Sequence, residues 1–176
     1  MLTSHGFAVT KRRHFERNVV LDTEPATLRP CGELLRLRQA AGETVITYKG
    51  RSVAQARHKT REEIETTAGD FDAIVAILER LGLRLGFRYE KYRTEFARLR
   101  EKGHAVLDET LIGVFLELEG TPAWIDRTAR RLGFGEADYL LQSYGALWAA
   151  HCEEQGWPAG RDFIFAEPKK RRGGVA

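Results

Sequence analysis

Alternation of apolar and charged residues, with like charges spaced two apart, is the feature of this sequence that most restricts its fold. In GVFLELEG, residues 113–120, Glu117 and Glu119 point to one face of a strand and the apolar residues between them point to the other. Two carboxylates that share a face repel each other. The pattern therefore predicts a strand with one apolar face and one acidic face that needs a positively charged group nearby.

Four further segments show the same alternation. Their charged residues that share a face are Arg36 and Arg38 in LLRLR, Lys49 in TVITYKG, Lys59, Arg61, Glu63 and Glu65 in HKTREEIET, and Lys91 and Arg93 in YEKYR. Five predicted strands thus present charge on a single face, with cations and carboxylates mostly on different strands. Like charges on one strand raise the electrostatic energy unless a group of opposite sign lies between them.

Two interpretations of this pattern stay open from the residues alone. In the first, a half-buried antiparallel sheet turns its polar face to solvent. In the second, the strands curl into a barrel whose charged interior binds a polyanion together with a divalent cation. The basic side chains would then bind phosphate oxygens, and the carboxylates would hold the metal ion. A barrel for an apolar ligand fits poorly, because the face opposite the leucines is charged.

The order of the predicted elements indicates the fold class. Strands are predicted at 17–23, 34–40, 44–50, 56–66, 86–96, 104–109 and 111–120. Asp70 is placed to cap a helix over 71–81, Pro122 begins a second helix that ends before Gly133, and a third helix is predicted over 136–152. Several strands, a helix, more strands and two helices predict an α+β fold with an antiparallel sheet.

Length and charge restrict the remaining possibilities. The 176 residues suit one domain over 1–165, followed at 166–176 by a basic tail, EPKKRRGGVA, that is expected to be disordered and solvated. The net charge of +3 is too small to indicate a nucleic-acid partner. Two cysteines without metal-ligand spacing and the lack of a long apolar run predict a reduced, cytoplasmic protein that does not enter a membrane.

The quoted motifs together resemble a known family. ELLRLRQAAGETVITYKG, ARHKTREEIET, GFRYEKYRTEF and AVLDETLIGVFLELEG, in this order, are similar to the CYTH superfamily, the triphosphate tunnel metalloenzymes. That family includes class IV adenylate cyclases, thiamine triphosphatases and inorganic triphosphatases. The resemblance extends from about Phe15 to Gly120, and it implies an antiparallel barrel with helices packed on its outside.

The resemblance also implies a role for each matched residue. The phosphate-binding set would be Arg36, Arg38, Lys49, Lys59, Arg61, Lys91 and Arg93. Within the tunnel, Glu63, Glu65 and Asp108 would orient the cations, and Glu117 with Glu119 would bind Mg²⁺ or Mn²⁺. Lys49, Arg93 and Asp108 would be the catalytic residues.

One motif of the family has no counterpart in this sequence. The family's first strand carries a Glu-x-Glu-x-Lys signature, and none occurs before Phe15. MLTSHGF instead resembles the end of the helix that follows that strand. Either the sequence starts after the first strand, which we expect, or this form of the protein lacks the strand. A barrel without this strand would have two unpaired edges, which makes a homodimer through an edge plausible.

The implied function is that of a metal-dependent enzyme that acts on a triphosphate-containing small molecule. ATP, thiamine triphosphate and tripolyphosphate are the expected substrates, and cyclase and phosphatase chemistry use the same kind of site. The alternative is a non-catalytic module of the same family that binds a polyphosphate or nucleotide. Nucleic acid and membrane are not expected partners.

Overall fold

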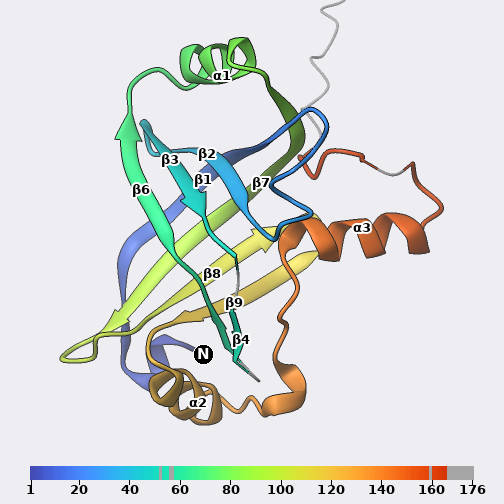
Figure 1. Ribbon diagram of the computed structural model, residues 1–176. Coiled ribbons are helices and arrows are strands. Elements are labelled where there is room, and N and C mark those ends of the chain that lie inside the picture. Colours follow the sequence, from blue (N-terminus) through green and yellow to red (C-terminus); the bar gives the residue numbers. More distant parts are fainter. Residues whose placement is uncertain (52, 56–57, 159, 166–176) are drawn as a thin grey trace, which may run out of the picture.

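A computed structural model describes residues 1–165 except 52, 56–57 and 159, and it leaves the side chains of 53–60 undescribed (Figure 1). Its elements are η1 (Thr3–His5), β1 (Phe7–Thr23), β2 (Leu34–Ala40), β3 (Glu43–Lys49), β4 (Val53–Gln55), β5 (His58–Thr60), β6 (Glu63–Ala68), α1 (Phe71–Arg80), β7 (Leu83–Arg98), β8 (His104–Thr110), β9 (Gly113–Glu119), α2 (Pro122–Arg131), η2 (Glu136–Asp138) and α3 (Tyr144–Glu154). The α+β class predicted from the sequence is confirmed. The expected tail at 166–176 lies outside the described residues.

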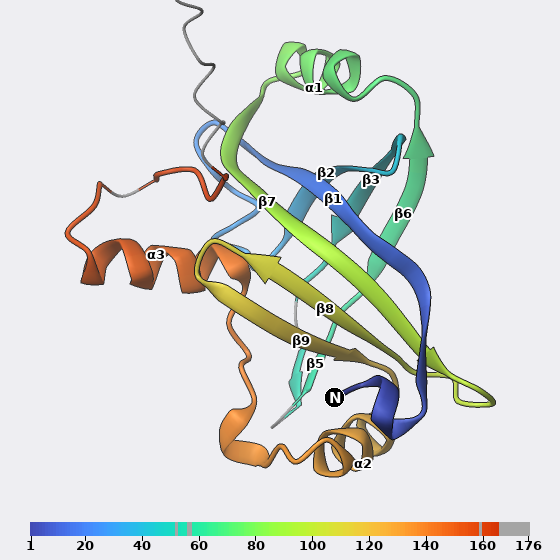
Figure 2. The same cartoon turned by 180° about the vertical axis from the view of Figure 1, so that it is seen from behind.

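The main sheet is antiparallel and has seven strands in the order β6-β3-β2-β1-β7-β8-β9. Strands β4 and β5 form a separate two-stranded sheet. Among the described residues, β6 and β9 are the two edges of the main sheet and are not paired with each other. The predicted closure into a barrel is therefore not seen, although the sheet is strongly curled in both ribbon views (Figures 1 and 2).

Two long strands form the middle of the sheet. Strand β1 has 17 residues and β7 has 16, and they pair from Phe7 with Arg98 to Thr23 with Leu83. The sequence analysis predicted only 17–23 and 86–96 for these strands. Their extensions are rich in charged residues, and they are strands because each supplies the hydrogen-bonding partner of the other.

Helices α1 and α2 cover the apolar face of the sheet at opposite ends of the molecule (Figure 2). Phe71 of α1 packs with Val19, Leu21 and Leu37 of β1 and β2. At the other end, Trp124 and Leu132 of α2 pack with Leu2, Phe7, Phe96 and Ala105. The N-cap expected at Asp70 is confirmed, because its side chain accepts a hydrogen bond from the backbone N–H of Ala73. Thr121 caps α2 in the same way, by a hydrogen bond from the backbone N–H of Trp124.

Helix α3 packs against the opposite face of the sheet. Trp148 and Cys152 of α3 lie against Tyr89 of β7 and Phe163 of the C-terminal segment. Phe163 also forms a parallel bridge with Tyr89, on the part of β7 that precedes its pairing with β8. The two faces of the sheet are therefore covered differently, with α1 and α2 on one face and α3 on one end of the other.

Two predicted elements were wrong in extent. The single strand predicted over 56–66 is divided, because Glu63–Ala68 pairs with β3 as β6 whereas His58–Thr60 pairs with β4. The helix predicted over 136–152 is interrupted, because only Glu136–Asp138 and Tyr144–Glu154 are helical and Ser143 caps the second of them. No helix in the described part of the chain has the length and apolar character needed to span a membrane.

Candidate functional site

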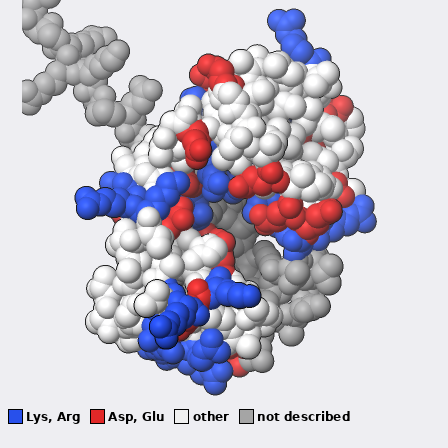
Figure 3. Space-filling model, turned by 90° about the vertical axis from the view of Figure 1, so that its left-hand side faces the viewer, with Lys and Arg blue, Asp and Glu red and all other residues white. Residues whose placement is uncertain are grey.

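The charged residues predicted from strand alternation lie on the face of the main sheet opposite α1 and α2. We call this surface the charged face. Its described members are Glu16, Asn18, Arg36, Arg38, Thr47, Lys49, Glu63, Glu65, Lys91, Arg93, Asp108 and Glu117. Figure 3 shows a side of the molecule that is hollowed at its centre, with basic and acidic side chains around the hollow.

Asp108 is the centre of a buried ionic network on β7, β8 and β9. Its side chain is 0% exposed and accepts hydrogen bonds from Lys91 Nζ at 2.7 Å and from Arg93 Nε and Nη2 at 2.7 and 2.6 Å. The Tyr144 hydroxyl at the start of α3 donates to Asp108 Oδ2 at 2.8 Å. Arg93 Nη2 also donates to Glu117 Oε2 at 2.7 Å. The structure thus brings three residues of the predicted site, Lys91, Arg93 and Asp108, into direct contact.

The network fixes the protonation of its members. Burial alone would raise the pKa of Asp108, but the hydrogen bonds and charges of Arg93 and Lys91 outweigh it and lower this pKa to about 2. Burial and the neighbouring carboxylates Glu117 and Asp108 raise the pKa of the Tyr144 hydroxyl. Asp108 is therefore ionised and Tyr144 is a hydrogen-bond donor at neutral pH.

Glu16 belongs to this network and was missed by the sequence analysis. It is 2% exposed, and its carboxylate lies 3.7 Å from Lys91 Nζ, 4.0 Å from Arg93 Nε and 4.0 Å from Arg38 Nη1. Burial would raise the pKa of Glu16, but Lys91, Arg93 and Arg38 outweigh it and lower this pKa. The strand was predicted to start one residue later, so the alternation in HFERN was not used.

The two arginines of β2 share a more distant and more exposed carboxylate partner, Glu65. Arg36 Nη2 and Arg38 Nη2 lie 3.9 and 3.7 Å from the oxygens of Glu65, whose side chain is 46% exposed. Thr47 Oγ1 donates to Glu65 Oε2 at 2.9 Å, and Arg36 Nη2 donates to Thr47 Oγ1 at 3.3 Å. Ion pairs with one exposed partner contribute little stability and are easily exchanged.

Lys49 and Arg61 share the carboxylate of Glu63. Lys49 Nζ donates to Glu63 Oε1 at 2.8 Å, and Arg61 Nε lies 3.6 Å from the same oxygen. Burial and the nearby Arg36 lower the pKa of Lys49. The structure therefore places these three predicted residues together at one end of the charged face, whereas the side chain of Lys59 is outside the described part of the structure.

The two predicted metal ligands have different environments. Glu117 bonds to Arg93, whereas Glu119 is 51% exposed and lies 3.0 Å from His104 Nε2. In the described part of the chain, no group of three or more His, Cys, Asp or Glu side chains is arranged to hold a metal ion. The described residues therefore do not form a complete metal centre, and we derive no catalytic step through a metal ion.

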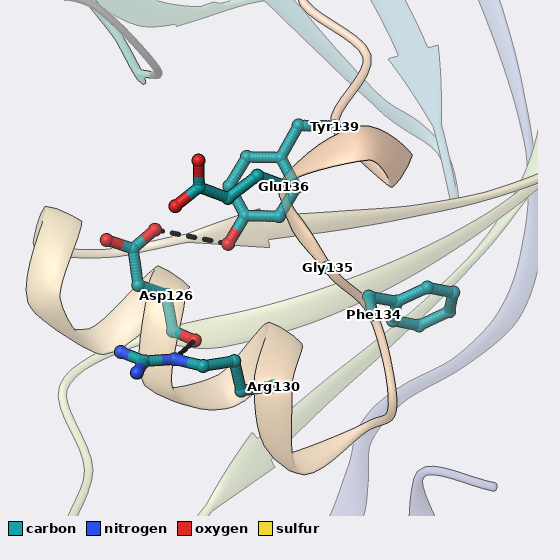
Figure 4. A pocket seen from close by; sticks show the side chains of 6 residues that line it. All are labelled: Asp126, Arg130, Phe134, Gly135, Glu136 and Tyr139. Carbon is teal, nitrogen blue, oxygen red and sulfur yellow. Dashed lines mark hydrogen bonds between the residues drawn. The ribbon is translucent and has the colours of Figure 1, made fainter.

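A separate hollow of about 310 Å³ lies between α2 and η2 (Figure 4). It is lined by Asp126, Arg130, Phe134, Gly135, Glu136 and Tyr139. None of these residues belongs to the charged face. A smaller hollow of about 40 Å³ reaches Glu16 and Arg38 at one end of the charged face. Of the predicted site residues, Arg38 lines this smaller hollow, and we take the charged face as the candidate site.

Comparison with known proteins gives a family match. Residues 4–144 match the CYTH domain. A protein of Methanocaldococcus jannaschii, described as a putative adenylate cyclase, is 31% identical over 114 residues, which cover 65% of this chain. The match spans 63% of the length of that relative.

Solved structures share the fold at lower identity. A protein of Pyrococcus horikoshii has a TM-score of 0.71 at 22% identity, with 84% of this chain and 90% of that chain covered. A Vibrio parahaemolyticus protein with the same description as the archaeal relative has a TM-score of 0.67 at 24% identity, covering 78% and 82%. An adenylyl cyclase homologue of Hippeastrum, described as having a dominant triphosphatase activity, has a TM-score of 0.59 at 14% identity, covering 84% of each chain.

Proposed function

Because this chain belongs to the CYTH domain family, we propose that its charged face binds the triphosphate group of a small molecule and acts on that group. CYTH domains bind triphosphate substrates, their family is generally metal-dependent, and most of its members are enzymes. The finer proposal is a triphosphatase or a class IV adenylate cyclase that uses Mg²⁺ or Mn²⁺. Its substrate would be ATP, thiamine triphosphate or tripolyphosphate.

The observation that carries this proposal is the set of cations on β2 and β3. Arg36, Arg38 and Lys49 lie on one face, and exposed carboxylates of β6 are their main partners on that side. Phosphate oxygens bind guanidinium and ammonium groups by the same charge-assisted hydrogen bonds as carboxylates. A polyphosphate can therefore replace Glu63 and Glu65 as the partner of these cations without loss of a buried ion pair.

We also propose that the curled sheet is the wall of a triphosphate tunnel. The apolar face carries α1 and α2 on the outside, and the charged face lies inside the curl. The contacts of Arg93 with Glu117 and of Arg38 with Glu65 each join strands that are separated by another strand. Such contacts are consistent with a sheet that bends toward its charged side.

The residues of this chain would contribute binding and orientation. Arg36, Arg38 and Lys49 would hold the phosphate oxygens and take up the negative charge that develops on the leaving phosphate. Arg93 and Lys91, held by Asp108, would have fixed positions on the other side of the bound group.

A binding module without catalysis is the second candidate, and the incomplete set of metal ligands among the described residues favours it. Assays of tripolyphosphate, thiamine triphosphate and ATP turnover with Mg²⁺, Mn²⁺ or EDTA separate the two. Metal-dependent release of phosphate, pyrophosphate or cyclic AMP that is lost in Lys49→Met supports the enzyme. Binding without turnover supports the module, and the absence of both refutes the proposed function.

A further inference from the structure

Asn18 occupies the middle of the charged face, and none of the roles described so far involves it. It lies on β1, two residues after Glu16, and its Cα partners are Arg38 on β2 and Tyr89 on β7. Residues two apart on a strand share a face, so Asn18 points to the same side as Glu16. The residue is only 1% exposed.

The Asn18 amide makes no hydrogen bond in the described structure. Both Nδ2 and Oδ1 are buried and lack a partner among the described residues. Buried side-chain amides are almost always hydrogen-bonded, because burial without a partner costs free energy. An exception at the centre of a site indicates that the amide has its partner in another state of the protein.

Two other unpartnered atoms lie next to Asn18. Arg36 Nε on β2 and Glu16 Oε2 on β1 are also buried without a hydrogen bond in the described structure. Arg36 pairs with Val20, two residues along β1 from Asn18, so the Asn18 and Arg36 side chains are diagonal neighbours on adjacent strands. Four buried polar atoms without a hydrogen-bond partner in the described structure therefore lie close together on the charged face.

The charges around this point favour an anion. Lys91, Arg93 and Arg38 all lie within 4.0 Å of the Glu16 carboxylate, so this carboxylate is already surrounded by cations. In register, the charged neighbours of Asn18 are the cations Arg38, Arg36 and Lys91 and one carboxylate, Glu16, so a metal ion at this point would be repelled more than attracted. An oxyanion, in contrast, is attracted by these charges and can accept hydrogen bonds from the Asn18 amide and from Arg36 Nε–H.

We propose that Asn18 is a ligand-binding residue, whose amide Nδ2 donates to an oxygen of a bound polyphosphate at a subsite shared with Arg36. The inference rests on the proposed function, because it names a contact within the same site. Because Asn18 is neutral, it adds no net charge to the site. Its amide would instead position an oxygen of the anion through a hydrogen bond of defined length and direction. In the absence of the ligand, the buried amide without a partner lowers the stability of the folded protein.

The substitution Asn18→Leu tests this proposal because stability and binding should change in opposite directions. Leucine has a similar size and no polar atoms, so the melting temperature should stay the same or rise. The affinity for tripolyphosphate, measured by titration calorimetry, should fall about 10- to 100-fold, as expected for the loss of a hydrogen bond to a charged group. A structural role for the amide would lower the melting temperature instead, and that result would overturn the proposal.

Thr128→Val is the matched control. Thr128 Oγ1 is also buried without a partner among the described residues, but it lies on α2, on the opposite side of the sheet. This variant should resemble Asn18→Leu in stability and the wild type in affinity. Equal affinity of wild type and Asn18→Leu would overturn the proposal, whereas failure of the wild type to bind tripolyphosphate would refute the proposed function itself.

A second measurement needs no variant. Asn18 is the only asparagine of the chain, so ¹⁵N-asparagine labelling gives a single side-chain amide signal. Addition of tripolyphosphate should shift the Nδ2 and proton resonances of this group and separate its two protons further. If calorimetry shows binding while this signal stays unchanged, Asn18 does not contact the ligand and the proposal is wrong.

Discussion

The two halves of the charged face are built from the same residue types but have different environments. On β7 and β8, Lys91, Arg93 and Asp108 are buried and joined by hydrogen bonds of 2.6–2.7 Å. On β2 and β6, the arginine–glutamate distances are 3.7–3.9 Å and the glutamate is half exposed. Removal of one partner from a buried pair is costly, whereas an exposed pair contributes about 0–1 kcal/mol. The half on β7 and β8 therefore stabilises the fold. The half on β2 and β6 has cations that can exchange their glutamate partner for a ligand.

The largest effect should come from Asp108→Ala. This change leaves Lys91 and Arg93 buried without their carboxylate, and the free energy of unfolding should fall by about 3–5 kcal/mol. The corresponding change in the other half, Glu65→Ala, should cost less than about 1 kcal/mol. Urea denaturation of both variants measures the difference, and equal losses would remove the distinction between the halves.

Acid should destabilise the protein through the same carboxylate. The pKa of Asp108 is lowered from 3.8 to about 2 in the folded state, so its contribution is complete above about pH 4 and is lost as the pH falls through 2. The contribution is about 2 kcal/mol. Stability measured between pH 5 and pH 2 should fall less steeply in Asp108→Ala than in the wild type, and parallel curves would contradict the assignment.

Tyr144→Phe removes the link from α3 to the buried half. The lost hydrogen bond to an ionised carboxylate should cost about 1.5 kcal/mol in the free energy of unfolding. Tyr139→Phe is a control on a hydroxyl that bonds to Asp126 outside the charged face. If Tyr144→Phe is as stable as the wild type, the contact of α3 with Asp108 does not support the network.

Glu65→Gln should have the smallest effect on stability, within about 0.5 kcal/mol. The substitution removes a negative charge that competes with the ligand for Arg36 and Arg38. We therefore expect a several-fold higher affinity for tripolyphosphate at low salt, with the gain reduced as ionic strength rises. A lower affinity would mean that Glu65 assists binding rather than being displaced.

Strand alternation predicted the charged face, because most strands of the sheet have one apolar side that packs against a helix or the core; β6 is an exception and is exposed on both sides. Alternation assigned Arg36, Arg38, Lys49, Glu63, Lys91 and Arg93 to the charged sides of their strands, whereas Asp108 was expected only from the family resemblance. Alternation did not predict how these charges divide into a buried and an exposed half. That division depends on α3, which covers only one end of the face, and on contacts between strands far apart in sequence.

Three failures of the sequence analysis have physical causes. Residues 10–16 of β1 are mostly polar on both sides and form a strand because β7 pairs with them, so Glu16 was left outside the predicted strand. The helix predicted over 136–152 continued across residues 139–143, which are not helical, and α3 begins only after its N-cap Ser143. The contact of the Tyr144 hydroxyl with Asp108 has no sequence signal.

The affinity of Arg38→Met for tripolyphosphate, compared with that of Arg17→Met, tests the central claim most directly. Both variants lose one arginine from the sheet, but Arg38 lies on the charged face and Arg17 bonds to Gln39 and Asp72 on the other face. We expect calorimetry to show a loss of about 10- to 100-fold for Arg38→Met and little change for Arg17→Met. Equal affinities of the two variants would contradict a polyphosphate site on the charged face.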